Sequence, residues 1–332
     1  MKNFFFFSFV LLFLNCGSNQ INEAGSNESV AINYANTITA SDLKTHLFTF
    51  ASDEFEGRLT GEPGQKKAAN YLRDFYISQN INSPLSNTYF QPISTENLRP
   101  HLKPSENVLA WIEGSSKPEE IIVITAHYDH LGMNNGEIYN GADDDGSGNV
   151  AILEIAQAFK KAKDEGNGPQ RSILFLHVTG EENGLLGSKF YVENPVFDLN
   201  KTIANLNIDM IGRIDDEHLN NSDYIYIIGS NKLSSELHEV SEEANKNFTN
   251  IELDYTFNTD NDPNRYYYRS DHYNFAKNNI PVIFYFNGTH QDYHKPSDTP
   301  DKIEYDLLAK RTKLIFYTAW ELANRENRIA LD

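Results

Sequence analysis

The sequence predicts an α/β fold, in which a mixed, mostly parallel central sheet is covered by helices on both faces. The run at 121–126 (IIVITA) is continuously apolar and largely β-branched, which is typical of a strand buried on both faces. From residue 121 onward, such runs alternate with segments whose apolar residues recur at helical spacing. A three-layer sandwich is therefore expected, with no room for a second inserted domain.

Before residue 121 the pattern is less regular. Residues 42–80 contain a helical start, a turn punctuated by Gly and Pro at 56–64, and an amphipathic helix at 65–78. That helix is predicted because its apolar residues, among them Leu72 and Phe75, fall on one face. Residues 81–118 are expected to form short strands and loops, of which 107–112 is the best strand.

After residue 121 the elements alternate. The helix at 147–163 is predicted from Ile152, Ile155, Ala156 and Phe159, which recur at core spacing. A loop rich in Asn, Asp and Tyr is expected from about 247 to 269. The predicted strands are 121–126, 172–178, 203–208, 224–228 and 281–286, and the predicted helices are 147–163, 185–192, 232–245, 271–277 and 305–324.

The first sixteen residues predict a secretory signal peptide. A basic start is followed by an apolar run at 4–14, which is too short to span a membrane as a helix. Cys16 is the only cysteine, and LNCG at 14–17 resembles a bacterial lipoprotein processing site, although Asn15 departs from the small residue usual there. We expect an exported bacterial protein, periplasmic or anchored to the outer membrane through a lipid on Cys16. Ordinary secretion is the alternative.

Two further parts of the chain follow this segment. Residues 17–38, rich in Asn, Ser and Ala, are expected to form a flexible tether. Residues 39–332 are expected to form one folded domain, since a chain of this length can bury a full core.

The charge balance restricts the partners. The chain carries 28 basic against 47 acidic residues, a net charge of −19 and a pI near 4.9. Because proteins that bind nucleic acids need basic surfaces, DNA and RNA are not expected as partners.

Three consecutive acids at 143–145 lie between glycines and precede the helix predicted at 147–163. Adjacent carboxylates repel one another and are usually solvated. Here the glycines permit close backbone approach to a bound ion, and the start of a helix tolerates negative charge. The stretch therefore predicts a bound cation.

Candidate ligands for such a cation follow the predicted strands. His127, Glu181, Glu182 and Asp209 each lie at or just past the C-terminal end of a strand, and His294 follows the strand at 281–286 by a short loop. In open α/β sheets, ligands bind in the crevice outside these strand ends. Mixed nitrogen and oxygen ligands without thiolates suit two divalent ions of the zinc type.

Neighbouring side chains refine these roles. Asp129 could accept a hydrogen bond from the second ring nitrogen of His127 and fix its tautomer, whereas His130 is the weaker candidate because nothing comparable supports it. Glu181 and Glu182 could divide the work, one binding metal and the other holding a proton. Each residue taken alone could instead be an ordinary structural or solvated side chain.

Five phrases stand out along the chain: SDEFEGRLTG (52–61), AHYDHLG (126–132), GADDDGSG (141–148), GEENGLLGS (180–188) and YHKPSDT (293–299). Together and in this order they resemble the di-zinc aminopeptidase family, which includes bacterial leucyl aminopeptidases, glutaminyl cyclases and glutamate carboxypeptidases. The resemblance runs from about residue 48 to 299, and the order of the phrases makes it specific.

The resemblance implies a zinc-exopeptidase-like sandwich over residues 39–332 with two zinc ions as cofactors. Asp144 would bridge both ions. His127 and Asp209 would complete one ion, and Glu182 and His294 the other.

The resemblance also implies the remaining roles. Glu181 would be the general base, and Asp129 would orient His127. Asp143 and Asp145 would support the loop and cap the following helix. Because glutaminyl cyclases work with one zinc, an intact His127 favours the hydrolytic members.

The expected function is removal of N-terminal residues from peptide substrates. A carboxypeptidase or amidohydrolase using the same metal pair is the main alternative, although it would need a cationic cluster to which only Arg213 and Arg265 could contribute. A non-catalytic surface-binding lipoprotein is less favoured, because no ligand is lost. Tyr266–Tyr268 and Phe284–Phe286 could line a side-chain pocket or belong to the core.

Overall fold

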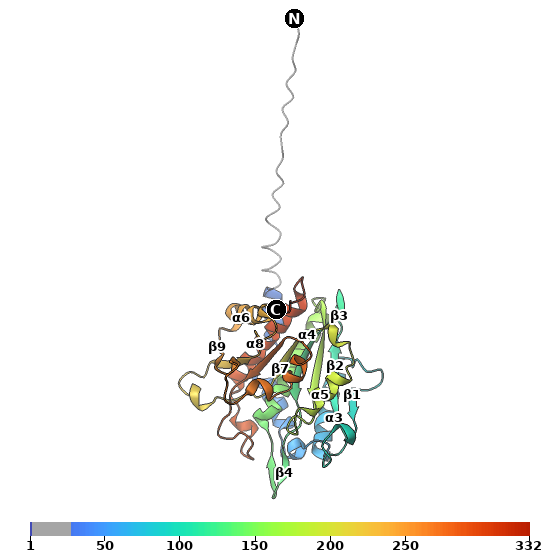
Figure 1. The fold of residues 1–332 in the computed structure, drawn as a ribbon, viewed down its shortest axis with the longest axis vertical. Coiled ribbons are helices and arrows are strands. Elements are labelled where there is room, and N and C mark those ends of the chain that lie inside the picture. The colour runs from blue at the N-terminus through green and yellow to red at the C-terminus, as the bar shows by residue number, and fades with distance from the viewer. Residues whose placement is uncertain (2–27) are drawn as a thin grey trace.

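The computed structural model describes Met1 and residues 28–332, so the predicted leader and Cys16 lie outside the described residues (Figure 1). Within that described part, no helix is both long and apolar enough to cross a membrane.

One mixed sheet of eight strands forms the centre of the described chain, in the order β1-β2-β6-β3-β7-β10-β8-β9. Neighbours from β6 through β3 and β7 to β10 are parallel, as are β8 and β9, whereas β1-β2, β2-β6 and β10-β8 are antiparallel. The predicted α/β class is confirmed. The strands are β1 (Phe90–Ile93), β2 (Ser105–Ile112), β3 (Lys117–His127), β6 (Arg171–Val178), β7 (Thr202–Ile208), β8 (Tyr224–Ile228), β9 (Glu252–Asp254) and β10 (Val282–Phe286).

Helices cover both faces of this sheet (Figure 1). The six predicted between residues 65 and 324 are all present, with bounds that differ by a few residues. The helices are α2 (Ala40–Phe50), α3 (Pro63–Ser78), α4 (Gly148–Asp164), α5 (Leu186–Glu193), α6 (Ser235–Ala244), α7 (His272–Ala276) and α8 (Tyr305–Asn324).

The two faces are visible in the packing of β3. Ile122 and Ile124 belong to a large buried cluster that includes residues of α4 and α8. Ile121 and Val123 belong to a second cluster that includes residues of α5 and α7. Because successive side chains of a strand point to opposite faces, this alternation explains why the run at 121–126 is apolar at nearly every position.

The expected tether does not extend through residues 28–38. Residues 28–35 are helical, and Ala31, Tyr34, Ala35 and Ile38 are buried in the large cluster. These four positions have the i, i+3, i+4, i+7 spacing of a helix that buries one face. The prediction was wrong there because the polar residues between them concealed the periodicity.

Two small elements were not predicted. A hairpin follows β3, formed by β4 (Gly132–Asn134) and β5 (Glu137–Tyr139). Its turn residues Asn135 and Gly136 both have positive φ, the conformation that suits a tight two-residue hairpin turn. The loop expected at 247–269 contains β9, which extends the sheet beside β8.

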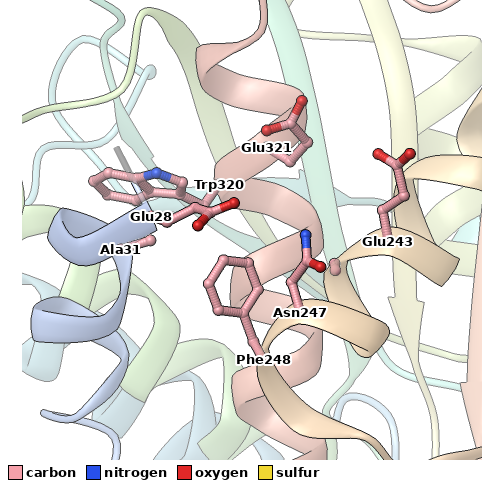
Figure 2. Close-up of a pocket in the computed structure, with 8 residues that line it drawn as sticks. Glu28, Ala31, Glu243, Asn247, Phe248, Trp320 and Glu321 are labelled. Atoms are coloured by element: carbon pink, nitrogen blue, oxygen red, sulfur yellow. The ribbon is translucent and has the colours of Figure 1, made fainter. Parts of the chain in front are cut away.

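A surface pocket lies between the N-terminal helix, α8 and the segment after α6 (Figure 2). Three glutamates, Glu28, Glu243 and Glu321, surround the rings of Phe248 and Trp320. Burial raises the pKa of Glu321, and the charges of Glu243 and Glu28 add to this effect. None of the residues lining this pocket belongs to the strand-end cluster of candidate metal ligands.

Candidate metal centre

The five predicted ligands meet at the carboxyl ends of the parallel strands. His127 is the last residue of β3, and Asp209 directly follows β7. Residues 181 and 182 come shortly after β6, and the acidic stretch at 143–145 precedes α4. The topology thus brings together side chains that are distant in sequence: His127, Asp144, Glu182, Asp209 and His294.

Asp144 lies at the centre of this group, with its two oxygens facing different partners. Oδ1 lies 3.1 Å from Nε2 of His127, which is itself 3.5 Å from Oδ1 of Asp209. Oδ2 lies 3.0 Å from Nε2 of His294, which is 3.3 Å from Oε2 of Glu182. One carboxylate therefore separates two pairs, each made of a histidine nitrogen and a carboxylate oxygen.

Several buried polar atoms in this cluster lack a hydrogen-bond partner among the described residues. They include Nε2 of His127, Oε1 of Glu182 and both ring nitrogens of His130. Buried polar atoms are costly unless they are paired, so a bound cation would satisfy this set. Two triads of donor atoms are close enough to hold an ion: His127, Asp145 and Asp209, and His130, Asp144 and Glu182.

His130 is closer to the cluster than its sequence context indicated. It is fully buried, and its Nδ1 lies 2.8 Å from Oε1 of Glu182 and 3.8 Å from Oδ2 of Asp144. Its partners come from other elements of the fold, so the local sequence gave no sign of them.

The outer two acids of the triplet are engaged by backbone groups. Oδ1 of Asp145 accepts hydrogen bonds from the N–H groups of Gly148 (3.0 Å) and Met210 (3.1 Å). Oδ1 of Asp143 accepts one from the N–H of Gly212 at 2.6 Å. These contacts fix the loop against the start of α4 and the end of β7. Asp145 is not confined to the supporting role expected for it, because its Oδ2 has no hydrogen-bond partner among the described residues and it belongs to a possible ion-holding triad with His127 and Asp209.

Asp298 completes the support of this loop and was not singled out from the sequence. Its carboxylate accepts hydrogen bonds from the backbone N–H groups of Asp143 (3.0 Å) and Asp144 (3.2 Å). Burial raises its pKa to about 6, and the charge of Asp143 adds to the shift. Asp298 lies in the YHKPSDT phrase, which was the only available sequence signal for it.

Asp129 corrects one expectation. Nδ1 of His127 lies 3.1 Å from the backbone carbonyl oxygen of Asp129 but 3.9 Å from its carboxylate, so the hydrogen bond goes to the carbonyl. The carboxylate instead accepts from Oγ1 of Thr60 (2.9 Å) and from the N–H of Glu181 (3.1 Å). The carbonyl of Asp129 thus fixes the tautomer of His127 and leaves Nε2 free, a role that was expected of the Asp129 side chain. The side chain instead holds the turn that carries Glu181.

Ser270 is a second supporting residue that the sequence did not identify. Its Oγ donates to Oδ2 of Asp209 at 2.7 Å and accepts from the amide of Asn207 at 2.8 Å. It belongs to the phrase RSDH at 269–272, whose acid and histidine are also buried. Ser270 therefore orients the Asp209 carboxylate.

Arg58 explains the SDEFEGRLTG phrase. Its fully buried guanidinium donates to the carbonyl oxygens of Phe50 (3.1 Å), Tyr128 (2.9 Å), Asn140 (2.7 Å) and Gly141 (2.9 Å). These bonds hold the segment before α3 against the backbone that follows His127 and against the loop that precedes Asp144.

Protonation differs between carboxylates of the cluster. Burial raises the pKa of Glu181 well above its usual range, and the nearby charge of Glu182 adds to this. Burial would also raise the pKa of Asp144, but the neighbouring imidazoles of His127 and His294 hold it well below the usual range. The surroundings thus shift the pKa values of Glu181 and Asp144 in opposite directions.

A pocket opens beside these residues. Tyr266, Phe284 and Phe286 line it, and the same rings belong to a buried aromatic cluster. These three residues are therefore part of the core and also form a wall of the pocket. The two cations considered for a carboxypeptidase, Arg213 and Arg265, are not among its lining residues. The full lining is Asp144, Glu181, Asp209, Met210, Tyr266, Arg269, Phe284, Phe286, Thr289, Tyr293 and His294.

Comparison with known sequences agrees with this geometry. Residues 107–319 match peptidase family M28. A probable leucine aminopeptidase of Trichophyton verrucosum is 32% identical over 294 residues, which cover 86% of this chain and 74% of that protein. A probable leucine aminopeptidase of Arthroderma benhamiae is 32% identical over 65% of this chain, which spans only 57% of the fungal protein.

Solved structures share the fold. The LapA aminopeptidase of Legionella pneumophila superposes with a TM-score of 0.70 at 22% identity, over 90% of this chain and 76% of LapA. BSAP, a zinc aminopeptidase from Bacillus subtilis, superposes with a TM-score of 0.68 at 15% identity, over 87% of this chain and 96% of BSAP.

Proposed function

Because the chain belongs to peptidase family M28, we propose that it is a two-metal aminopeptidase that removes N-terminal residues from peptides. The observation that carries the proposal is the position of Asp144, whose two oxygens face separate pairs of a histidine and a carboxylate. The sequence relatives are named probable leucine aminopeptidases, which supports both peptide-bond hydrolysis and cleavage from the N-terminus.

The donor set fits two zinc ions. His127 and Asp209 would hold one ion, Glu182 and His294 the other, and Asp144 would contact both. When bound, the ions would polarise the scissile carbonyl and increase the acidity of the attacking water.

Glu181 is proposed as the general base. Its raised pKa makes its carboxylate a stronger proton acceptor, so it would take a proton from water and pass it to the leaving amine. The backbone N–H of Glu181 is fixed by the carboxylate of Asp129, which limits the movement of the turn during this transfer.

The acidic lining of the pocket supports action at a free N-terminus. Asp144, Glu181 and Asp209 line one pocket with the aromatic rings, so a substrate ammonium group would find carboxylates there. The first side chain of the peptide would then lie against the rings of Tyr266, Phe284 and Phe286.

Export is proposed from the leader at residues 1–16, with Cys16 as the site of lipid attachment in a bacterial envelope. The proposal depends on the sequence alone, because this segment lies outside the described residues. Such an anchor would leave the catalytic region free to act on peptides outside the cytoplasm.

The experiment uses the protein without residues 1–20. Bound metal is measured by mass spectrometry, and cleavage is assayed on matched peptides with free and with acetylated N-termini. We expect two metals per chain and release of the first residue from free N-termini only. Internal cleavage of blocked peptides, or release from the C-terminus, would overturn the aminopeptidase assignment.

The two cations considered for a carboxypeptidase do not support that alternative. Arg213 is paired with Asp292 at 2.9 Å, and Arg265 lies over the ring of Tyr268 and does not line the pocket. The non-catalytic alternative is also disfavoured, because every candidate ligand and the candidate base are present.

A further inference from the structure

We propose that Arg269 makes the pocket beside the metal centre a binding site for a substrate carboxylate. The inference rests on the proposed aminopeptidase function and specifies its substrate class. The carboxylate would come from an acidic first residue or from the free C-terminus of a very short peptide, and both sources present the same group to the guanidinium.

Arg269 lines the pocket that also contains Glu181 and Asp209. It follows a short helical turn, Tyr266–Tyr268, and its guanidinium carbon lies 5.0 Å from the centre of the Tyr266 ring. When a guanidinium stacks on an aromatic ring, its flat face contacts the ring. The N–H groups around its edge remain available for hydrogen bonds.

The charge of Arg269 is not neutralised by a neighbour. Among the described side chains, no carboxylate lies within ion-pair distance of it, although the chain has 47 acidic residues. Two other cations of this region are paired, Arg213 with Asp292 at 2.9 Å and Lys232 with Asp260 at 2.6 Å, whereas Arg265 has no ion pair among the described side chains but does not line the pocket. Arg269 is thus a cation in position to pair with an incoming anion.

The apolar walls of the pocket indicate which part of the substrate carries the anion. Tyr266, Phe284 and Phe286 offer apolar walls, which suit the methylene groups of a glutamate side chain or the body of a second residue. A carboxylate matches the planar fork of Arg through two parallel hydrogen bonds. A leucine side chain would fill the same walls but leave the guanidinium without a partner.

The test compares substrates within one enzyme, so that loss of fold or metal cancels in the ratio. Metal-loaded wild type and Arg269→Gln are assayed with glutamyl and leucyl p-nitroanilides, and with the dipeptide Leu-Gly and its C-terminal amide. The control is Arg265→Gln, since Arg265 is also exposed and stacks on a tyrosine (Tyr268, 4.9 Å) but does not line the pocket.

If the first residue supplies the carboxylate, Arg269→Gln should lower the glutamyl-to-leucyl ratio of kcat/KM by about 10-fold or more, as expected for loss of a charge-assisted pair. If the C-terminus supplies it, the ratio of Leu-Gly to its amide should fall instead. Arg265→Gln should leave both ratios unchanged.

The proposal is overturned if Arg269→Gln changes neither ratio, or if Arg265→Gln changes them equally. Failure of the underlying function would look different, because wild type would then release no residue from any of the four substrates. Binding of free L-glutamate and L-leucine, measured by calorimetry on the wild type and Arg269→Gln, provides a readout independent of turnover. If the first side chain supplies the carboxylate, Arg269→Gln should weaken glutamate binding more than leucine binding; if the α-carboxylate is the group bound, both should weaken, and unchanged binding of both amino acids would contradict the proposal.

Discussion

At the scale of single residues, the surroundings of Asp144 and Glu181 shift the pKa of the same chemical group in opposite directions. Two neighbouring histidines hold the pKa of Asp144 well below its usual range, whereas burial and neighbouring carboxylates raise the pKa of Glu181. Two carboxyl groups with separated pKa values can serve separate roles, one holding metal and the other moving a proton.

Glu181→Gln tests that division directly. The amide keeps the shape of the side chain but cannot accept the proton, so kcat should fall by about 10²-fold or more while two metals stay bound. Metal content and kcat are measured on the same preparation. Glu193→Gln, an exposed substitution on α5, is the control and should leave both unchanged. Activity close to that of wild type in Glu181→Gln would remove this residue from the mechanism.

Glu154 should make stability depend on pH. It is buried, its Oε1 lies 3.5 Å from Nε2 of His46, and burial, together with the charge of Asp42, raises its pKa to about 8. In the unfolded chain this carboxyl ionises near its usual pKa of about 4.5, so its ionisation opposes folding increasingly from about pH 4.5 to about pH 8.

We therefore expect Glu154→Gln to stabilise the protein more at pH 9 than at pH 5, by ~2 kcal/mol or more. The measurement is the free energy of unfolding from urea denaturation at both pH values. The exposed substitution Glu239→Gln should show no such difference. An equal effect of Glu154→Gln at pH 5 and pH 9 would contradict the prediction.

At the scale of elements, the N-terminal helix belongs to the folded core. Tyr34 is 4% exposed and Ile38 fully buried, and the ring of Tyr34 lies 5.8 Å from that of Trp320 in α8. A stripe of four apolar residues is enough to hold a short helix against the core, although the surrounding composition is that of a linker.

Removal of residues 1–38 should therefore lower the melting temperature, whereas removal of residues 1–27 should not. The buried side chains of Tyr34 and Ile38 alone are expected to contribute ~3 kcal/mol or more to folding. Calorimetric melting of the two shortened proteins against the full chain checks this. Equal melting temperatures for all three would show that the helix does not contribute to stability.

At the scale of the whole molecule, the candidate metal centre connects parts of the chain that are otherwise separate. Its side chains come from the ends of β3 and β7, from the segments after β6 and β10 and from the loop before α4, while Arg58 binds the region before α3 to the same loops. A metal that binds only this folded arrangement must stabilise the whole domain.

Removal of metal with a chelator should lower the melting temperature. At a free metal concentration of about 100 times Kd, one ion contributes ~2.7 kcal/mol. Asp144→Asn should melt at a lower temperature than wild type in zinc and should respond less to the chelator, because the bridging position is weakened. An unchanged melting temperature after confirmed loss of metal would contradict the proposed coupling.

The sequence by itself determined the α/β class, nearly all of the helices and long strands, and the set of candidate ligands. These features depend on local patterns: apolar periodicity defines each element, and the position of His127 or Asp209 at the carboxyl end of a strand places it at the sheet edge.

Only the tertiary structure decided which groups support the site. The carbonyl of Asp129 rather than its carboxylate holds His127. His130, Asp298, Ser270 and Arg269 lie in phrases that stand out in the sequence, but their contacts at the site were not predicted. The physical reason is that each of these roles depends on a distance between residues far apart in the chain, which the sequence pattern of a single element does not contain.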